Sequence, residues 1–136
     1  MSDAPETPAV EAPTGKPRIT IVDDDRDTRE LLKTALEGEG YDVNVVSNGL
    51  RLISTLQVDR PDLVMLDVIM SWIDGFELCR AIKKNADFKD IPILFLSART
   101  DPEDIRCGFE CGCADYFTKP VDLERLCTRI REILGE

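Results

Sequence analysis

Four short apolar runs in this chain each stop at a polar residue. The runs are 19–22, 63–66, 93–96 and 116–118, and they are followed by Asp23 and Asp24, by Asp67, by Ser97, and by Lys119 and Pro120. Runs this short and apolar are typical of strands buried on both faces, as in a parallel sheet covered by helices. The carboxyl ends of such strands meet at one edge, where ligands bind in open sheets of this kind. We therefore expect the acids, the hydroxyl and the lysine to converge there.

Clustered carboxylates with one lysine and one hydroxyl suit a divalent cation and a phosphoryl group. Acids held together raise one another's pKa unless a cation offsets their charge. Mg²⁺ does this through a few carboxylates while keeping several waters. A carboxylate can also attack phosphorus and form an acyl phosphate. Taken alone, the acids after residue 22 also fit a solvated helix start, but an EF-hand is excluded because Thr28 and Thr34 replace its glycine and glutamate.

The rest of the sequence alternates helix and strand. Helices are predicted over 25–39, 49–58, 102–111, and from 75 and 122 onward. One further strand is predicted over 41–46, and the runs at 93–96 and 116–118 are expected to belong to strands over 91–96 and 115–118. The apolar faces of the first two helices are expected to be Leu31, Leu32, Ala35 and Leu36, and then Leu50, Ile53 and Leu56. Five such repeats predict an α/β, three-layer sandwich with a parallel sheet.

Composition restricts the partners. The net charge is −10 over 136 residues, which argues against direct nucleic-acid binding and against an anionic membrane surface. No apolar stretch approaches the roughly 20 residues of a membrane span, so a cytoplasmic protein is expected. Residues 1–17 hold four of the eight prolines and are predicted to be a flexible tail before a domain over 18–136.

Five cysteines and no histidine are present. Three of the cysteines lie close together in the sequence, at Cys107, Cys111 and Cys113, but no Cys-x-x-Cys pair occurs. Structural zinc sites typically use that tighter spacing. The cysteines are therefore interpreted as small, reduced and mostly buried apolar residues rather than as metal ligands.

Four motifs carry a resemblance to a known family. They are Ile21-Val22-Asp23-Asp24-Asp25, then Met65-Leu66-Asp67 through Asp74-Gly75, then Leu96-Ser97-Ala98, and finally Ala114-Asp115-Tyr116 with Thr118-Lys119-Pro120. In order and spacing, over residues 18–136, they resemble the receiver domain of bacterial two-component response regulators. The resemblance implies a flavodoxin-like, doubly wound sheet in the order 2-1-3-4-5, whose switch point lies between strands one and three.

The resemblance also implies a role for each site residue. Asp67 would be the phosphoacceptor, and Asp24, Asp67 and the backbone carbonyl of Ile69 would bind Mg²⁺, with Mn²⁺ as an alternative ion and Asp23 acting mainly through a metal-bound water. Lys119 would pair with the phosphoryl group and Ser97 would hydrogen-bond it. Ser97 and Tyr116 would also form the switch that remodels the fourth helix, fifth strand and fifth helix. The Lys119–Pro120 bond is expected to be cis.

The expected function is that of a stoichiometric phosphoacceptor rather than an enzyme, with self-catalysed transfer and slow autodephosphorylation. The phosphoryl donor would be a sensor histidine kinase or a histidine phosphotransfer protein, and the output would go to an unknown protein target. The domain would be a monomer or a phosphorylation-dependent dimer, without an effector domain in the chain as given. A haloacid-dehalogenase-type phosphatase is disfavoured because Ile69 stands where its second acid belongs, and a degenerate docking receiver is disfavoured by the intact polar set. Ser71 departs from the family's usual proline.

Overall fold

The computed structural model describes residues 15–136, so most of the predicted tail, residues 1–14, lies outside the described residues. A five-stranded parallel sheet has the order β2-β1-β3-β4-β5, which confirms the predicted order. The strands are β1 (Arg18–Val22), β2 (Asp42–Val46), β3 (Leu63–Leu66), β4 (Ile93–Ser97) and β5 (Asp115–Thr118). The helices are α1 (Arg26–Gly38), η2 (Gly49–Arg51), α2 (Leu52–Val58), α3 (Gly75–Lys84), α4 (Pro102–Glu110) and α5 (Leu123–Leu134).

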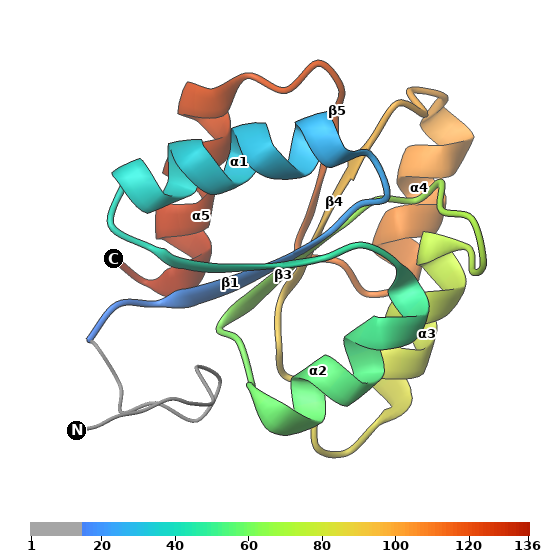
Figure 1. Ribbon diagram of the computed structural model, residues 1–136. Coiled ribbons are helices and arrows are strands. Elements are labelled where there is room, and N and C mark those ends of the chain that lie inside the picture. Colours follow the sequence, from blue (N-terminus) through green and yellow to red (C-terminus); the bar gives the residue numbers. More distant parts are fainter. Residues whose placement is uncertain (1–14) are drawn as a thin grey trace.

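Helices cover both faces of the sheet and complete three layers. α1 and α5 lie on one face, and α2, α3 and α4 lie on the other (Figure 1). Each face has its own apolar cluster, one built on Leu32, Leu36 and Ile130, and the other on Leu56, Phe76 and Ile82. Every residue of β3 and β4 is buried. This two-sided burial explains why these strands read as continuous apolar runs.

Two apolar positions predicted for the core lie on the surface. Leu31 is 55% exposed, because the buried stripe of α1 runs through Leu32 and Leu36, one helical turn apart. Leu50 is 60% exposed, whereas Leu52 is fully buried. The reason is that a 3₁₀ turn, capped by the Asn48 side chain, precedes α2 and shifts its inward face. Strand β4 also begins two residues later than predicted.

The cysteines follow the predicted burial only in part. Cys79, Cys111 and Cys127 are buried, but Cys107 is exposed on α4, which corrects the expectation there. Burial raises the pKa of Cys79 and of the half-buried Cys113 to about 12, so both thiols stay protonated near neutral pH. These buried cysteines therefore act as small apolar residues in the core.

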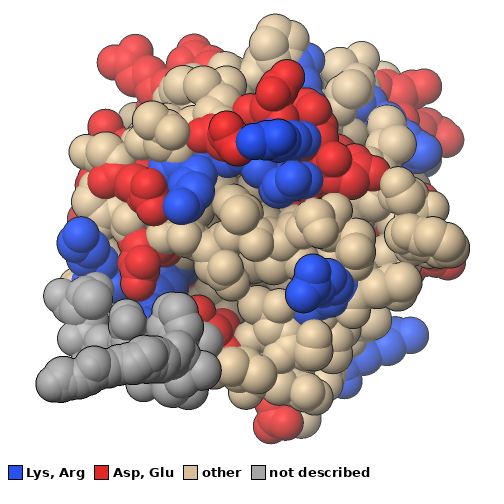
Figure 2. All heavy atoms as spheres, in the orientation of Figure 1, with Lys and Arg blue, Asp and Glu red and all other residues tan. Residues whose placement is uncertain are grey.

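The described helices do not provide a membrane span: none of them combines the necessary length with the necessary apolar character. On the face shown in Figure 2, Lys and Arg side chains lie beside Asp and Glu side chains. The described surface on this side is thus a mixture of charges, with a largely uncharged centre, and presents no continuous basic patch of the kind that a phosphate backbone requires.

Candidate functional site

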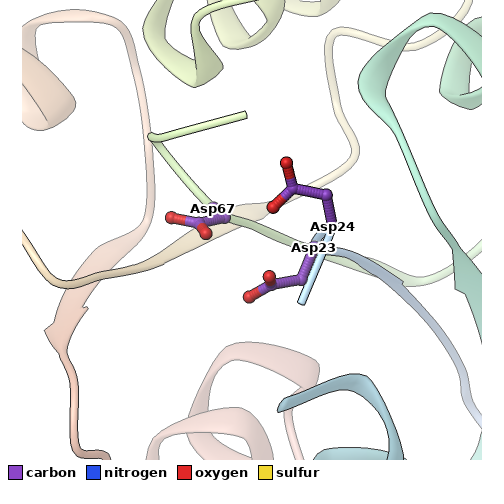
Figure 3. Close-up of side chains that lie close together, drawn as sticks. All are labelled: Asp23, Asp24 and Asp67. Atoms are coloured by element: carbon purple, nitrogen blue, oxygen red, sulfur yellow. The ribbon is translucent and has the colours of Figure 1, made fainter. Parts of the chain in front are cut away.

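Three aspartates meet at the carboxyl edge of the sheet. Asp23 and Asp24 follow β1, and Asp67 follows β3. The two strands are neighbours with Val22 paired to Leu66, so the acids that come next lie side by side. One carboxylate oxygen from each aspartate lies within 4.8 Å of the others, and Figure 3 shows the three side chains lying close together. This is the switch point of the sheet, as predicted.

Lys119 reaches this cluster from the loop after β5. Its Nζ donates to Asp23 Oδ2 at 2.9 Å and to Asp67 Oδ2 at 3.2 Å. The Lys119 backbone N–H donates to the Ser97 carbonyl at 2.8 Å, which extends the β4–β5 pairing to the sheet edge. The Lys119–Pro120 bond is cis, as predicted. One ammonium group is therefore shared by the two most buried carboxylates of the site.

Backbone N–H groups hold the other oxygens of these two carboxylates. The Asp25 N–H donates to Asp23 Oδ1 at 2.8 Å, and the Ile69 N–H donates to Asp67 Oδ1 at 3.1 Å. Hydrogen bonds to a carboxylate fix its rotamer and stabilise its charged form. Each acid thus has one oxygen bound by its own loop and the other directed at Lys119.

Burial and charge act differently on Asp67 and on Lys119. Burial, and then repulsion from Asp23, raise the pKa of Asp67 above its usual 3.8. Burial alone would lower the pKa of Lys119, but its contacts with Asp23 and Asp67 raise it overall. The difference arises because Lys119 gains from two carboxylates while each carboxylate has only a share of one cation. The site therefore carries excess negative charge that an added cation would offset.

The donor set fits a hard divalent cation. All three side chains offer carboxylate oxygens, the ligands that Mg²⁺ prefers. Asp23 and Asp67 are 2% and 6% exposed, whereas Asp24 is exposed and opens the site to water. Mg²⁺ usually keeps several waters and takes only one or two protein carboxylates. A half-open cluster of this kind meets that requirement better than a closed cage would.

Ser97 and Tyr116 are linked to each other through Arg99. Ser97 is fully buried at the end of β4, and its Oγ accepts a hydrogen bond from the Arg99 N–H at 3.1 Å. The Tyr116 hydroxyl donates to the Arg99 carbonyl at 2.9 Å. The Arg99 guanidinium in turn lies 3.6 Å from Asp104 on α4. The predicted switch residues therefore share the β4–α4 loop as a common partner.

Two hydrogen bonds at the site could not be predicted from the sequence. Ser71 Oγ donates to Asp24 Oδ2 at 2.9 Å, and Arg29 Nη1 donates to the Asp23 carbonyl at 2.6 Å. Ser71 was noted only as a departure at a loop position. Neither contact follows from hydrophobic periodicity, because each joins polar groups of a loop or of the first turn of a helix.

We expect the metal-free site to destabilise the fold in a pH-dependent way. Because the pKa of Asp67 is raised, the folded protein binds this proton more tightly than the unfolded chain. Ionised Asp67 therefore lowers the free energy of unfolding above its folded pKa, and the penalty disappears as pH falls toward 3.8. Asp67→Asn should raise the melting temperature in EDTA at pH 7, and the gain should shrink toward pH 4.

Thermal melts across this pH range, with and without Mg²⁺, measure both effects. For the wild-type protein, Mg²⁺ at a hundred times its dissociation constant should add about 2.7 kcal/mol of stability. Asp90→Asn, at an exposed position before the amino end of β4, is the control and should leave the response to Mg²⁺ unchanged. If the difference in melting temperature between Asp67→Asn and the wild type did not change with pH, this prediction would be wrong.

Comparison with known proteins identifies the class. Residues 19–131 match the response regulator receiver domain family. The response regulator MprA of Mycolicibacterium vanbaalenii is 42% identical over 117 residues, which are 86% of this chain and 50% of that protein. The chain thus spans about half the length of the curated relatives it matches.

Solved structures agree with the family match. The signal receiver domain of a signal transduction histidine kinase from Syntrophus aciditrophicus has a TM-score of 0.81 and 37% identity, covering 88% of this chain and 90% of that one. The chemotaxis protein CheY4 of Vibrio cholerae has a TM-score of 0.81 and 28% identity, covering 87% and 98%. The fold and the acidic edge define a doubly wound receiver. The chain belongs to the response regulator receiver domain family of two-component systems.

Proposed function

We propose that this receiver accepts one phosphoryl group on Asp67 from a phosphohistidine of a partner protein. The observation that carries the proposal is the contact of Lys119 Nζ with both Asp67 and Asp23 inside a three-aspartate cluster. Asp67 is the only member of the cluster that ends the strand β3, and its Oδ2 is directed at the ammonium group. A phosphoryl group on that oxygen would keep Lys119 as its counter-ion.

The transfer needs a nucleophile, charge compensation and little else. An Asp67 carboxylate oxygen forms a bond to phosphorus while the phosphorus–nitrogen bond of the phosphohistidine breaks, and the electron pair returns to the imidazole. Lys119 offsets charge on the phosphoryl oxygens, and Ser97 donates a hydrogen bond to one of them. Positioning and charge compensation provide most of the rate in phosphoryl transfer. The chain therefore promotes its own modification without being an enzyme in turnover.

A divalent cation completes the proposed site. Asp24, Asp67 and the backbone carbonyl of Ile69 would hold Mg²⁺, or Mn²⁺ in its place, and Asp23 would contact it mainly through water. The cation supplies charge neutralisation for the acids and for the incoming phosphoryl oxygens. The excess negative charge around Asp67 and the exposure of Asp24 support this assignment.

The proposed output passes through Ser97, Arg99 and Tyr116. An aspartyl phosphate adds roughly two negative charges and new acceptor oxygens. If the Ser97 hydroxyl turned toward the phosphoryl group, the Arg99 N–H would lose its hydrogen-bond acceptor. The Arg99 carbonyl also accepts the hydrogen bond from the Tyr116 hydroxyl. We propose that Tyr116 then turns inward and changes the α4–β5–α5 surface. The phosphorylated form would be a selected population of this fold.

The proposed partners are a sensor histidine kinase or a histidine phosphotransfer protein as donor, and a protein target as recipient of the signal. We place the protein in the cytoplasm, as a monomer or as a dimer that forms on phosphorylation. We further propose that residues 18–136 act as the receiver unit and that residues 1–17 lie outside it; β1 begins at Arg18.

Incubation with acetyl phosphate and Mg²⁺, followed by intact mass measurement, tests the proposal. A receiver gains one phosphoryl group that persists long enough to be measured. A phosphatase would release inorganic phosphate continuously without accumulating the labelled protein. A constitutive docking module would gain no mass. Only the first outcome supports the proposed function.

Ile69 is expected to lengthen the life of the phosphorylated state. Its N–H is bound to Asp67, and its side chain is 48% exposed at the entrance to the site. A polar side chain there could orient the attacking water, whereas isoleucine cannot. Such orientation is worth at most about 10²–10⁴ in rate, so Ile69→Asn should speed dephosphorylation severalfold while leaving Mg²⁺ affinity nearly unchanged.

Decay of the labelled protein, followed by mass, measures this effect. Arg99 could shield the phosphoryl group from its own side, so Ile69→Asn is compared in the wild-type and the Arg99→Ala backgrounds. Equal lifetimes with isoleucine and asparagine in both backgrounds would show that water access at this position does not control the decay.

A further inference from the structure

One hydrogen bond joins the two loops that form the acidic site. Ser71 Oγ, in the loop after β3, donates to Asp24 Oδ2, in the loop after β1, at 2.9 Å. The two residues are 47 positions apart in the sequence. Both side chains are exposed, so neither contact partner is fixed by burial in the core. The bond therefore depends on the relative position of the two loops and in turn restrains it.

Burial fixes the second loop around Ser71 only in part: Met70 and Ile73 are half-buried and pack against the core, but the side chains beside them are exposed. Trp72 is 75% exposed and Ile69 is 48% exposed. At its two ends the loop is anchored by hydrogen bonds from backbone N–H groups: Ile69 N–H donates to the Asp67 side-chain Oδ1, and Gly75 N–H donates to the Val68 carbonyl. Ser71 lies between these anchors, and its hydroxyl reaches across to Asp24. The hydroxyl is thus placed to hold the middle of this loop against the loop after β1.

We propose that Ser71 is a positioning residue for the divalent cation. It orients the Asp24 carboxylate and at the same time restrains the loop that carries the Ile69 carbonyl. This inference rests on the proposed function, because it takes Asp24 and Ile69 as ligands. A carboxylate has two oxygens with several acceptor positions, so the bond to Ser71 leaves Asp24 able to bind an ion.

The effect on affinity follows from preorganisation. Without the hydroxyl, the exposed Asp24 side chain samples other rotamers, and the loop around Ile69 loses a restraint. Cation binding must then order both elements. Loss of an outer hydrogen-bond partner of a metal ligand typically weakens binding 10- to 100-fold. Because water competes for this exposed bond, we expect the lower end, about tenfold.

The test measures Mg²⁺ binding in the absence of any phosphoryl donor. Calorimetric titration gives the dissociation constant, and the fluorescence of Trp72, the single tryptophan, reports on the loop. We expect Ser71→Ala to raise the dissociation constant about tenfold and to reduce the Trp72 response at saturating Mg²⁺. Ser71→Thr keeps the hydroxyl and should restore both. The melting temperature in EDTA should stay near that of the wild type.

Ser54→Ala is the matched control. Ser54 Oγ also makes one exposed hydrogen bond, at 3.1 Å to the Arg51 carbonyl at the start of its own helix α2. This bond does not involve an acid of the cluster, so its loss should not affect Mg²⁺ binding. Wild-type affinity in Ser71→Ala, or failure of Ser71→Thr to restore it, would overturn the inference. Asp24→Asn distinguishes failure of the Ser71 inference from failure of the proposed cation site. If it weakens Mg²⁺ binding and Ser71→Ala does not, the inference fails alone; if neither weakens it, the proposed cation site fails as well.

Discussion

Asp67→Asn is expected to abolish phosphorylation by acetyl phosphate in the presence of Mg²⁺. The amide has nearly the same shape as the carboxylate and can still accept the Ile69 N–H, but it is not a nucleophile toward phosphorus. The proposed function assigns Asp23 and Asp24 to the cation alone, so neither is expected to replace Asp67 as the acceptor. The intact mass should therefore show no added phosphoryl group.

Asp74→Asn provides the control for this substitution. Asp74 lies at the other end of the same loop and caps α3 by accepting the Phe76 N–H at 2.7 Å. Asparagine is as good a cap as aspartate, so the fold should be retained and the protein should be labelled as well as the wild type. Full labelling of Asp67→Asn, mapped to another acid, would show that the acceptor is wrongly assigned.

Gly75→Ala is expected to lower the free energy of unfolding by about 3 kcal/mol or more. This is the upper end of the range for replacing a residue by one too large for its site. A Cβ at this position would lie 2.7 Å from Val68 Cα and would also overlap the Asp67 carbonyl oxygen. These are backbone atoms, which cannot turn away as a flexible side chain can. The start of α3 would have to move from the end of β3, and the Gly75 N–H bond to the Val68 carbonyl would weaken.

Denaturant unfolding measures this loss, and Gly38→Ala is the matched control. No atom lies within 4 Å of a Cβ built on Gly38, at the end of α1. Alanine there should stabilise the protein by about 0.4–1 kcal/mol, because it restricts the unfolded chain. If both substitutions change stability alike, the close approach of α3 to Asp67 does not constrain residue 75. A displaced α3 should also slow phosphorylation, since the overlapped atoms belong to the backbone of Asp67 and of the next residue, Val68.

Much of the fold could be predicted because two-sided burial leaves a direct mark on sequence. The strands β3 and β4 are apolar at nearly every position, and the polar residue that follows each one marks the sheet edge. Asp67 after β3 and the two acids after β1 converge as predicted, because neighbouring parallel strands end at the same edge. Lys119 follows the strand β5, so the sequence also indicated that it lies at this edge of the sheet.

The buried faces of the helices were predicted correctly only in part, because a shift of one residue changes which side chains are buried. Leu31 and Leu50 are apolar and were assigned to the core, yet both are exposed. Composition cannot distinguish them from Leu32 and Leu52, which are fully buried. The difference arises from how α1 is rotated on the sheet and from the 3₁₀ turn before α2, and both depend on packing against the strands.

The sequence by itself determined the class of fold, the edge where the polar residues gather and the kinds of side chain that meet there, because these follow from local patterns of burial and charge. Only the tertiary structure decided how the charges are shared: Lys119 crosses to both Asp23 and Asp67, and Ser71 reaches Asp24 over 47 positions of sequence. Such contacts depend on where loops lie once the strands have paired. No periodicity records them, since each joins single side chains from separate loops.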